Sequence, residues 1–293
     1  MKPWDARHQL PVFRAIVILG SLLVPSGGPG PVYAQSITWD RLAEGLAIGV
    51  WTPPAVCPDV APLVATEIDP KRYRFSVHYY RNEPVGEPPD IHEWQTRTGH
   101  DLVFNAGLFR ENFAYLGLLY GQGKSLGGKR HVSWMGLFVA EPVAPGRHAA
   151  GILDLAQDSF DEQQPPYGEA AQSLMLLDRT GKVRVRQSGK QSQQTIVAEQ
   201  DDGRILVLKT TKVTSLHAIG QCLHEAYPGI RQAMAMDGGS SSDMSISPAL
   251  KQGVDNLPGP HPWRLLLNDG TTGHIGLPAV IGVSPRRDAA TKP

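Results

Sequence analysis

The sequence feature best suited to chemistry is the segment Asp237–Ser242, in which an acidic residue precedes two glycines and three serines. The apolar residues before it predict a buried strand that would hold the Asp237 carboxylate at its end, where ligand-binding residues commonly lie. Gly238 and Gly239 permit backbone conformations closed to other residues. Free N–H groups in such a turn, with a hydroxyl such as that of Ser240, suit an anion such as phosphate. A polar hairpin turn without a further task has the same composition.

A second apolar strand signal, ending at Phe104, leads into Asn105, Ala106 and Gly107. The Asn105 amide offers both donors and an acceptor, which suits a sugar hydroxyl or an acetamido group. The guanidinium of Arg110, shortly after, suits bidentate pairing with phosphate. As alternatives, Asn105 is an ordinary turn residue and Arg110 is a charge on the surface.

Two further polar groups stand next to predicted strands: Glu169, Gln172 and Ser173, then Gln194 and Thr195. The sequence has no HExxH, paired-cysteine or EF-hand motif, so it predicts neither a metal site nor a cofactor. The alternative is a divalent cation held by Asp237, Asp243 and loop carbonyls. There is also no GxSxG elbow and no Walker loop, which argues against an α/β-hydrolase and a P-loop enzyme.

The elements that must position these residues are mostly strands. Apolar or alternating runs predict strands at residues 73–80, 101–104, 115–119, 135–140, 173–177, 183–185, 195–197, 204–208, 232–236, 263–267 and 275–283. One helix is predicted, with a cap at Thr214 or Ser215 and an end at residues 227–229. Its His217 and His224 share a face, and without a third ligand nearby a structural role is expected for them. The fold class is therefore α+β, with a mostly antiparallel or mixed sheet core and few helices.

Composition and charge bound the protein class. The 28 basic and 28 acidic residues give a formal net charge of +0, and no dense Lys/Arg block occurs, so no nucleic-acid partner is expected. A length of 293 residues and a hydrophobic content of 41% favour one large domain with a sizeable core. The two cysteines, Cys57 and Cys222, either form one disulfide or remain separate buried thiols.

Residues 1–34 are typical of a secretory signal peptide, with basic residues before an apolar run at 15–24 and Val32-Tyr33-Ala34 at the cleavage position. An uncleaved membrane anchor is the alternative, but the apolar run is much shorter than the ~20 residues that a span needs. We therefore expect an exported protein, periplasmic or secreted, with no membrane span after signal cleavage. A disordered tail is expected at 286–293.

Taken in order, the motifs resemble the phosphodiester glycosidase family. Its characteristic segments are matched by residues 105–109, 117–123, 172–173, 194–198, 216–223 and 234–241. The resemblance covers residues 65–285, which leaves 35–64 as an N-terminal segment of the mature chain. The chief departure is Gln194, where the family usually has arginine, and Leu108 and Ser240 are milder ones.

The resemblance implies a hydrolase that cleaves the glycosidic bond of a sugar-1-phosphodiester, of the N-acetylglucosamine type, for example in a phosphorylated glycan. It makes Asp237 the catalytic carboxylate, as base or electrostatic stabiliser, with Glu169 as a candidate second carboxylate. Gly238, Gly239 and Ser240 would hold the anion and Asn105 the sugar. The other expected substrate-binding residues are Gly107, Arg110, Gln172, Ser173, Gln194 and Thr195.

Two alternatives to this enzyme remain. A non-catalytic glycan-binding protein on the same scaffold is favoured by Gln194, because loss of the arginine removes a strong anion contact. An exported esterase using Ser240 to Ser242 lacks a recognisable base partner in the sequence.

Overall fold

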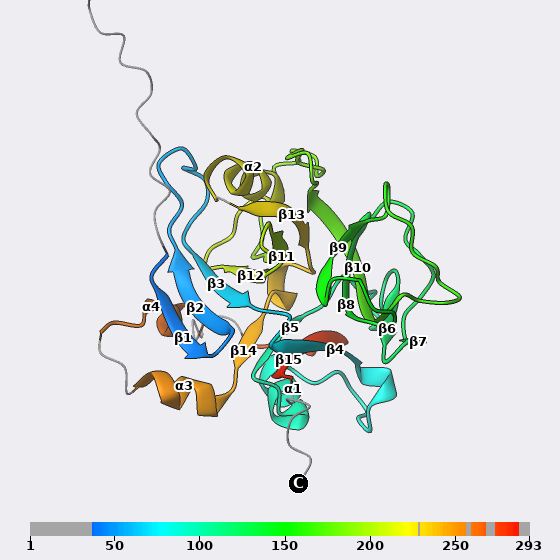
Figure 1. Ribbon diagram of the computed structural model, residues 1–293. Helices are drawn as coiled ribbons and strands as arrows, with labels where there is room; N and C mark the ends of the chain where they lie inside the picture. Colours follow the sequence, from blue (N-terminus) through cyan, green and yellow to red (C-terminus); the bar gives the residue numbers. More distant parts are fainter. Residues whose placement is uncertain (1–36, 228, 256–258, 268–272, 287–293) are drawn as a thin grey trace, which may run out of the picture. The chain divides into compact units, whose positions relative to one another are not determined.

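The computed structural model describes residues 37–227, 229–255, 259–267 and 273–286. The expected signal peptide at 1–34 lies outside the described residues, as does the expected tail apart from Arg286. Within these ranges the chain forms two antiparallel sheets and four α-helices (Figure 1). No described helix has both the length and the apolar character needed to cross a bilayer.

The larger sheet has eleven strands: β1 (Trp39–Ala43), β2 (Leu46–Trp51), β3 (Leu63–Ile68), β6 (Leu119–Gly121), β7 (Lys124–Ser125), β8 (Gly136–Pro142), β9 (Ala150–Asp154), β10 (Tyr167–Leu177), β11 (Thr195–Gln200), β12 (Ile205–Thr210) and β13 (Ile230–Ala235). The smaller sheet has the order β14 (Met244–Ile246), β5 (Leu102–Asn105), β15 (Ala279–Pro285), β4 (Tyr73–Tyr79). The helices are α1 (Ile91–Thr98), α2 (Leu216–Ala226), α3 (Pro248–Asp255) and α4 (Pro262–Leu267), with short 3-10 turns at Tyr80–Asn82 and Gly239–Ser241. The expectation of mostly antiparallel strands with few helices is confirmed.

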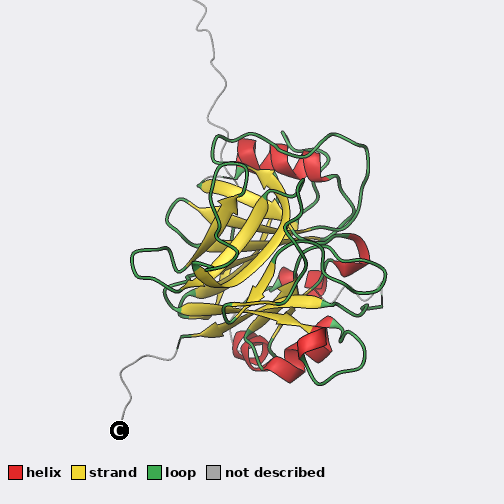
Figure 2. Ribbon diagram, turned by 90° about the vertical axis from the view of Figure 1, so that its right-hand side faces the viewer, coloured by secondary structure: helices red, strands yellow, loops and turns green. Residues whose placement is uncertain are grey.

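The two sheets pack against each other through the largest apolar cluster, which joins Phe75 and Phe104 of the smaller sheet to Phe138 of the larger one. A second cluster lies on the other face of the larger sheet, where α2 packs. A third places Trp94 of α1 against Val280 of β15, on the outer face of the smaller sheet. The layers are therefore α2, large sheet, small sheet and α1, and Figure 2 shows helices on both sides of the strands. Helices α3 and α4 instead contribute Val254 and Trp263 to the cluster between the sheets.

Alternation along the central strands explains this layering. In β11, Val197 faces the cluster between the sheets, while Ile196 and Ala198 face α2. In β12, Val207 likewise faces the cluster between the sheets, while Leu208 faces α2. Successive side chains of a strand point to opposite faces, so a strand that is apolar on both faces must be covered on both.

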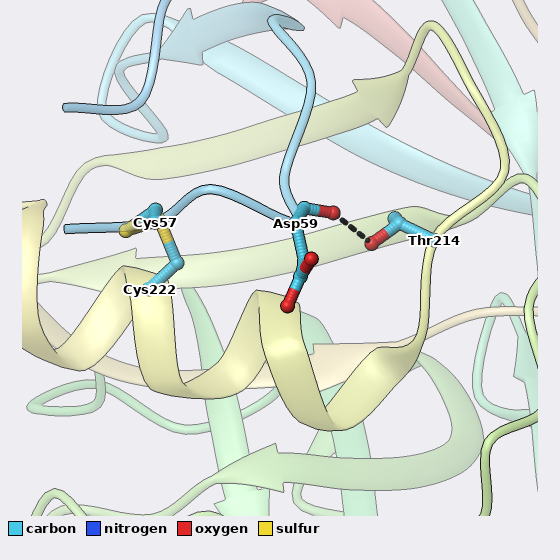
Figure 3. The surroundings of a disulfide bond; sticks show 4 residues. All are labelled: Cys57, Asp59, Thr214 and Cys222. Atoms are coloured by element: carbon cyan, nitrogen blue, oxygen red, sulfur yellow. Dashed lines mark hydrogen bonds between the residues drawn. A yellow bond between two sulfur atoms is a disulfide. The ribbon is translucent and has the colours of Figure 1, made fainter. Parts of the chain in front are cut away.

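The helix α2 is fixed at its start by a cap and within its length by a disulfide, and its first turn borders the site described below. The hydroxyl of Ser215 caps it by accepting a hydrogen bond from the Ala218 N–H at 3.1 Å, as predicted. Cys222 forms a disulfide with Cys57, with the two Cα atoms 5.5 Å apart, which decides between the two states that the sequence left open. Figure 3 shows this bond together with the Thr214 hydroxyl, which donates to the Asp59 carbonyl at 3.0 Å.

One predicted strand is wrong: residues 263–267 belong to helix α4. Pro262 occupies the first helical position, where its missing N–H costs nothing. Trp263 and Leu267, four residues apart, are buried together on one face, whereas Leu265 is 80% exposed. The helical spacing of the buried residues therefore outweighed the β-like composition of the segment.

Other differences concern the presence or extent of elements. The segment 183–185 forms only an isolated bridge to Leu177 instead of a strand. Of the predicted strand 115–119, only Leu119 lies in a strand, as the first residue of β6, and Tyr115 forms an isolated bridge to Phe109. Helices α1 and α3 were not predicted. The N-terminal segment 35–64, outside the family resemblance, supplies β1 and β2, of which β2 pairs with β3 and β1 pairs with β2, so that both extend the larger sheet.

Candidate functional site

The candidate site is a cavity of about 550 Å³ beside the turn that follows β13. Side chains reach it from the loop before β8, from β10, from the segment 184–194 and from the first turn of α2. Its lining residues are Leu108, Ser133, Trp134, Met135, Leu174, Met175, Arg184, Val185, Arg186, Ser188, Lys190, Ser192, Gln194, Ser215, Leu216, His217, Met236, Asp237, Gly238 and Gly239.

Asp237 is the only carboxylate among the described residues that line this cavity. Its Oδ1 accepts a hydrogen bond from the N–H of Gly238 at 3.0 Å. Burial raises the pKa of Asp237 to about 6, although hydrogen bonding with Ser241 and Gly238 and the charge of Lys190 act in the opposite direction. At neutral pH the carboxylate is therefore ionised but poorly solvated, which suits a base or an electrostatic stabiliser.

Two positive charges without a carboxylate partner accompany Asp237. Arg184 is neutralised, because its Nη1 lies 3.0 Å from Asp154 Oδ2 and 3.2 Å from Asp178 Oδ2. Arg186 and Lys190 are exposed at the cavity and form no ion pair with any described residue. Their charges are available to an anionic group entering the cavity.

The glycine turn does not offer the free amides expected from the sequence. The Gly238 N–H donates to Asp237 Oδ1, and the Gly239 N–H donates to the Gln193 carbonyl at 2.8 Å. Ser240 is exposed and lines a separate small pocket instead of the cavity. The expected anion cradle is therefore corrected, because the groups available to an anion are basic side chains and not these amides. The esterase alternative also loses support, since none of Ser240, Ser241 and Ser242 lines the cavity.

Asn105 lies buried beneath this turn, at the end of β5. Its Nδ2 donates to the carbonyl oxygen of Asp237 at 2.8 Å, and its Oδ1 accepts from the N–H of Asp243 at 3.1 Å. The Asn105 amide is thus occupied by the backbone at the two ends of the turn 237–243. The expected contact with a sugar is replaced by the positioning of the segment that carries Asp237.

Gln172 also positions the cavity wall without lining it. Its Oε1 accepts from the N–H groups of Leu118 and His131, both at 2.9 Å. Its Nε2 donates to the carbonyls of His131 and Trp134 at 2.9 and 2.6 Å, so every donor and acceptor of the amide is used. These bonds hold the loop that places Trp134 at the cavity, with its ring stacked on His131 at a centroid distance of 3.8 Å.

Of the remaining expected residues, Gln194 lines the cavity directly. Its Nε2 donates to the Ser192 hydroxyl at 2.6 Å. Its side chain packs against Gly238 so closely that a Cβ added at position 238 would lie only 2.7 Å from Gln194 Oε1. Thr195 and Ser173 are buried behind the wall. The Thr195 hydroxyl lies 2.9 Å from that of Ser242, and the Ser173 hydroxyl donates to the Ala235 carbonyl at 2.6 Å.

Glu169 does not line the cavity, so its assignment as a second catalytic carboxylate is corrected. Its Oε2 accepts from the Val77 N–H of β4 at 2.7 Å, and its Oε1 accepts from the Gln122 N–H at 3.0 Å. Burial raises the pKa of Glu169 to about 7, against the effect of these two hydrogen bonds. Both oxygens serve the backbone of other strands and turns, which is a structural role.

Gly107 and Arg110 are also outside the cavity lining. The Gly107 N–H donates to the Tyr115 hydroxyl at 3.1 Å, and a Cβ here would lie 2.5 Å from both that hydroxyl and the Gln172 carbonyl. Only glycine permits this contact between the segments. Arg110 is exposed, in keeping with the surface position that the sequence left open for it.

Several residues of the cavity lining were not predicted from the sequence, namely Trp134, Arg184, Arg186, Lys190 and, as a cavity residue, His217. A signal existed for the basic ones, since residues 182–190 contain four Lys/Arg in nine positions. No such signal marks Trp134, because its place depends on the side chain of Gln172, 38 residues later. In the described part of the chain no group of three or more His, Cys, Asp or Glu side chains could hold a metal ion.

Comparison with known proteins identifies the scaffold. The sequence profile of the phosphodiester glycosidase family matches residues 102–266, which contain the whole cavity lining. No curated protein shows a sequence match.

Two solved structures are similar in fold. A hypothetical protein from Synechocystis matches with a TM-score of 0.58 and 13% identity, over 87% of this chain and 64% of its own. The catalytic domain of zebrafish N-acetylglucosamine-1-phosphodiester alpha-N-acetylglucosaminidase, auto-inhibited by its pro-peptide, matches with a TM-score of 0.51 and 14% identity, over 86% of this chain and 82% of its own. The chain thus spans somewhat less than two thirds of the Synechocystis protein. At these identities the likeness concerns the fold.

Proposed function

The chain belongs to the phosphodiester glycosidase family, and on this premise we propose that it hydrolyses the glycosidic C–O bond of a sugar-1-phosphodiester. The observation that carries the proposal is the cavity in which a poorly solvated carboxylate, Asp237, lies with Arg186 and Lys190, two basic residues that form no ion pair with any described residue. A carboxylate suits the cationic sugar carbon of the transition state, and the basic residues suit the phosphate.

A single carboxylate is compatible with this reaction because of the leaving group. Glycosidases with alkoxide leaving groups need a second carboxyl group to protonate the departing oxygen. A phosphate monoester departs as an anion, so positive charge can take the place of that proton. In the proposed mechanism Arg186 and Lys190 stabilise the departing phosphate. Asp237 stabilises the oxocarbenium-like sugar or removes a proton from the attacking water.

The sugar-binding wall of the cavity is provided by Trp134. Its ring is partly buried and held by the stack on His131 and by the bonds from Gln172 to its loop. An aromatic face fixed in this way buries the apolar face of a sugar ring at little cost in side-chain entropy. We infer a pyranose such as N-acetylglucosamine as the sugar, by analogy with the reaction named for the zebrafish enzyme.

Hydrolysis of UDP-N-acetylglucosamine tests the proposal, with free N-acetylglucosamine as the measured product. The wild-type protein should release the sugar, and Asp237→Asn should remove this activity while the unfolding midpoint stays close to that of the wild type. Full activity in a folded Asp237→Asn protein would exclude the carboxylate from the chemistry.

A glycan-binding protein without catalysis is the second candidate, and Gln194 is the observation that favours it. The family arginine at this place would add a further charge to the cavity, whereas the Gln194 amide is engaged with Ser192. Calorimetric binding of the same substrate without any release of sugar would favour this candidate.

We further propose that the protein is exported. The signal-peptide pattern at residues 1–34 and the disulfide between Cys57 and Cys222 support an oxidising destination, periplasmic or extracellular. Expression of the full chain, cell fractionation and mass spectrometry of the mature N-terminus test this, with Gln35 expected as the first residue. Recovery of the uncut chain in the cytoplasm would contradict it.

A further inference from the structure

We propose that His92 and His274 form a binding site for a divalent first-row transition-metal ion of the Zn²⁺ type, separate from the Asp237 cavity. His92 lies in the first turn of α1, and His274 lies in the segment before β15, 182 residues later. Their Nε2 atoms are 3.0 Å apart, and the two rings meet edge to face, with planes at 84°.

This separation is close to that of two histidines on one metal ion. With Zn–N distances of about 2.0–2.1 Å and tetrahedral angles, the two nitrogens would be roughly 3.3 Å apart. A change of a few tenths of an ångström is within reach of two exposed side chains. Imidazole is the ligand shared by Zn²⁺, Cu²⁺ and Ni²⁺ sites, which defines the class of ion.

The other nitrogen of each ring has a partner of the kind that orients metal-binding histidines. His274 Nδ1 lies 2.5 Å from Asp243 Oδ2, and His92 Nδ1 lies 3.3 Å from Ser245 Oγ. A carboxylate can only accept, so the proton of neutral His274 sits on Nδ1 and its Nε2 carries a lone pair. Such a carboxylate–histidine arrangement is a regular outer partner of metal sites.

The lone pair of His274 Nε2 can accept a hydrogen bond from His92 Nε2 or bind a metal ion. If Ser245 donates to His92 Nδ1, then His92 Nε2 carries a hydrogen and bonds to His274. If Ser245 accepts, both Nε2 atoms carry a lone pair at a separation of 3.0 Å, and an ion bound to the two nitrogens would satisfy both. Both rings are exposed, so water can fill the other coordination positions of an ion, which two imidazoles alone leave open. The structure thus supplies two fixed ligands and an open approach.

The proposed ion would lie at the far end of the turn that holds Asp237. The carboxylate of Asp243 is hydrogen-bonded to His274, and its backbone N–H donates to the Asn105 side chain. The same Asn105 side chain donates to the carbonyl of Asp237. An ion at the histidines would therefore stabilise the folded chain.

A second histidine pair provides an internal control. The Nε2 atoms of His78 and His100 are 2.8 Å apart, but His100 is only 8% exposed and packs against the backbone at Gly282. Its Nδ1 is 2.5 Å from the Ser284 hydroxyl. This enclosed pair leaves no approach for an ion with its waters, so we expect it to be a hydrogen-bonded pair without metal.

Equilibrium dialysis of the untagged chain against ZnCl₂ tests the proposal, with bound zinc measured by atomic absorption. One ion per chain is expected, and His92→Gln or His274→Gln should weaken binding by at least about tenfold, as removal even of an outer partner does. His148→Gln, which removes an exposed histidine elsewhere, and His78→Gln should leave it unchanged.

Two additional readouts make the result independent of activity. Cu²⁺ bound at the site should show hyperfine coupling to two imidazole nitrogens in electron paramagnetic resonance, and one nitrogen in His274→Gln. Zinc should raise the unfolding midpoint of the wild type but not of that variant. Absence of stoichiometric binding, unchanged binding in His274→Gln, or its loss in His78→Gln would overturn the proposal.

Discussion

Asp237 and Glu169 are both buried carboxyl groups with raised pKa values, yet only one of them lies in a cavity. Burial raises the pKa to about 6 for Asp237 and to about 7 for Glu169. Glu169 accepts backbone hydrogen bonds on both of its oxygens, from Val77 and Gln122. Asp237 is hydrogen-bonded to Gly238 and Ser241, but it also faces the cavity, with Lys190 nearby. A perturbed pKa therefore reports burial, and access to a ligand decides which group is a candidate for chemistry.

The largest difference between the two carboxylates is expected in turnover. Asp237→Asn should lower kcat for UDP-N-acetylglucosamine by about 10²–10⁴-fold, because a positioned carboxylate contributes about that much. Glu169→Gln, measured per folded molecule, should keep kcat close to that of the wild type. Equal losses in the two variants would break the distinction drawn between them.

The basic residues sharpen the comparison, because Arg186 and Lys190 line the same cavity as Asp237, whereas the positive charge that acts on Glu169 is that of Arg74. Arg186→Ala and Lys190→Ala should each reduce kcat/KM by roughly 10–100-fold, since a hydrogen bond to a charged group contributes about 1.5–3 kcal/mol. Lys212→Ala removes an exposed lysine that does not line the cavity and serves as the matched control. A similar loss in that control would indicate a general effect of surface charge.

The pH dependence of activity is the third test. If Asp237 acts in its ionised form, the rate should rise with pH and reach half of its maximum near the pKa of about 6. Below that value it should fall about tenfold per pH unit. The positive charge of Lys190 lowers the pKa of Asp237. Lys190→Ala removes that charge, so the midpoint of the pH profile should move upward in this variant. A profile that is flat between pH 5 and pH 8 would contradict the assignment.

The smallest effect on turnover, but a measurable one on stability, is expected for Glu169→Gln. The glutamine amide can accept from only one of the two backbone N–H groups, and an unpaired buried group costs about 1–3 kcal/mol. Burial raises the pKa of Glu169 from 4.5 in the unfolded chain to about 7, so the folded chain favours the protonated side chain. This preference stabilises the fold fully below pH 4.5, and the stabilisation is lost as the pH rises to 7. Urea unfolding should therefore show a larger cost of the substitution at pH 5 than at pH 8. The reverse order would mean that hydrogen bonding outweighs burial at Glu169.

Much of the framework around Asp237 could be predicted because the signals are local. The buried strand before Asp237, the hairpin around Asp202 and the capped helix after Ser215 each depend on residues within one element. Asp90 and Gly99, which cap α1 at its two ends, are local signals of the same kind, although helix α1 was not predicted. Helix α4 was mistaken for a strand because six residues are too few for periodicity to distinguish the two.

The roles of side chains within the site were harder to predict. Asn105 and Gln172 were expected at the ligand and instead hold the backbone of the turn and of the Trp134 loop. An amide side chain suits a sugar hydroxyl and a peptide group equally well, so its chemistry cannot show which of them it meets.

The sequence by itself determined the order of strands and turns, the family and the carboxylate at 237, because each of these depends on residues that are close together along the chain. Only the tertiary structure decided that Cys57 meets Cys222, that Lys190 lies near Asp237, and that His92 lies beside His274. These partners are separated by 165, 47 and 182 positions along the chain. Contact at such separations depends on how the two sheets and their helices pack, and no local pattern encodes it.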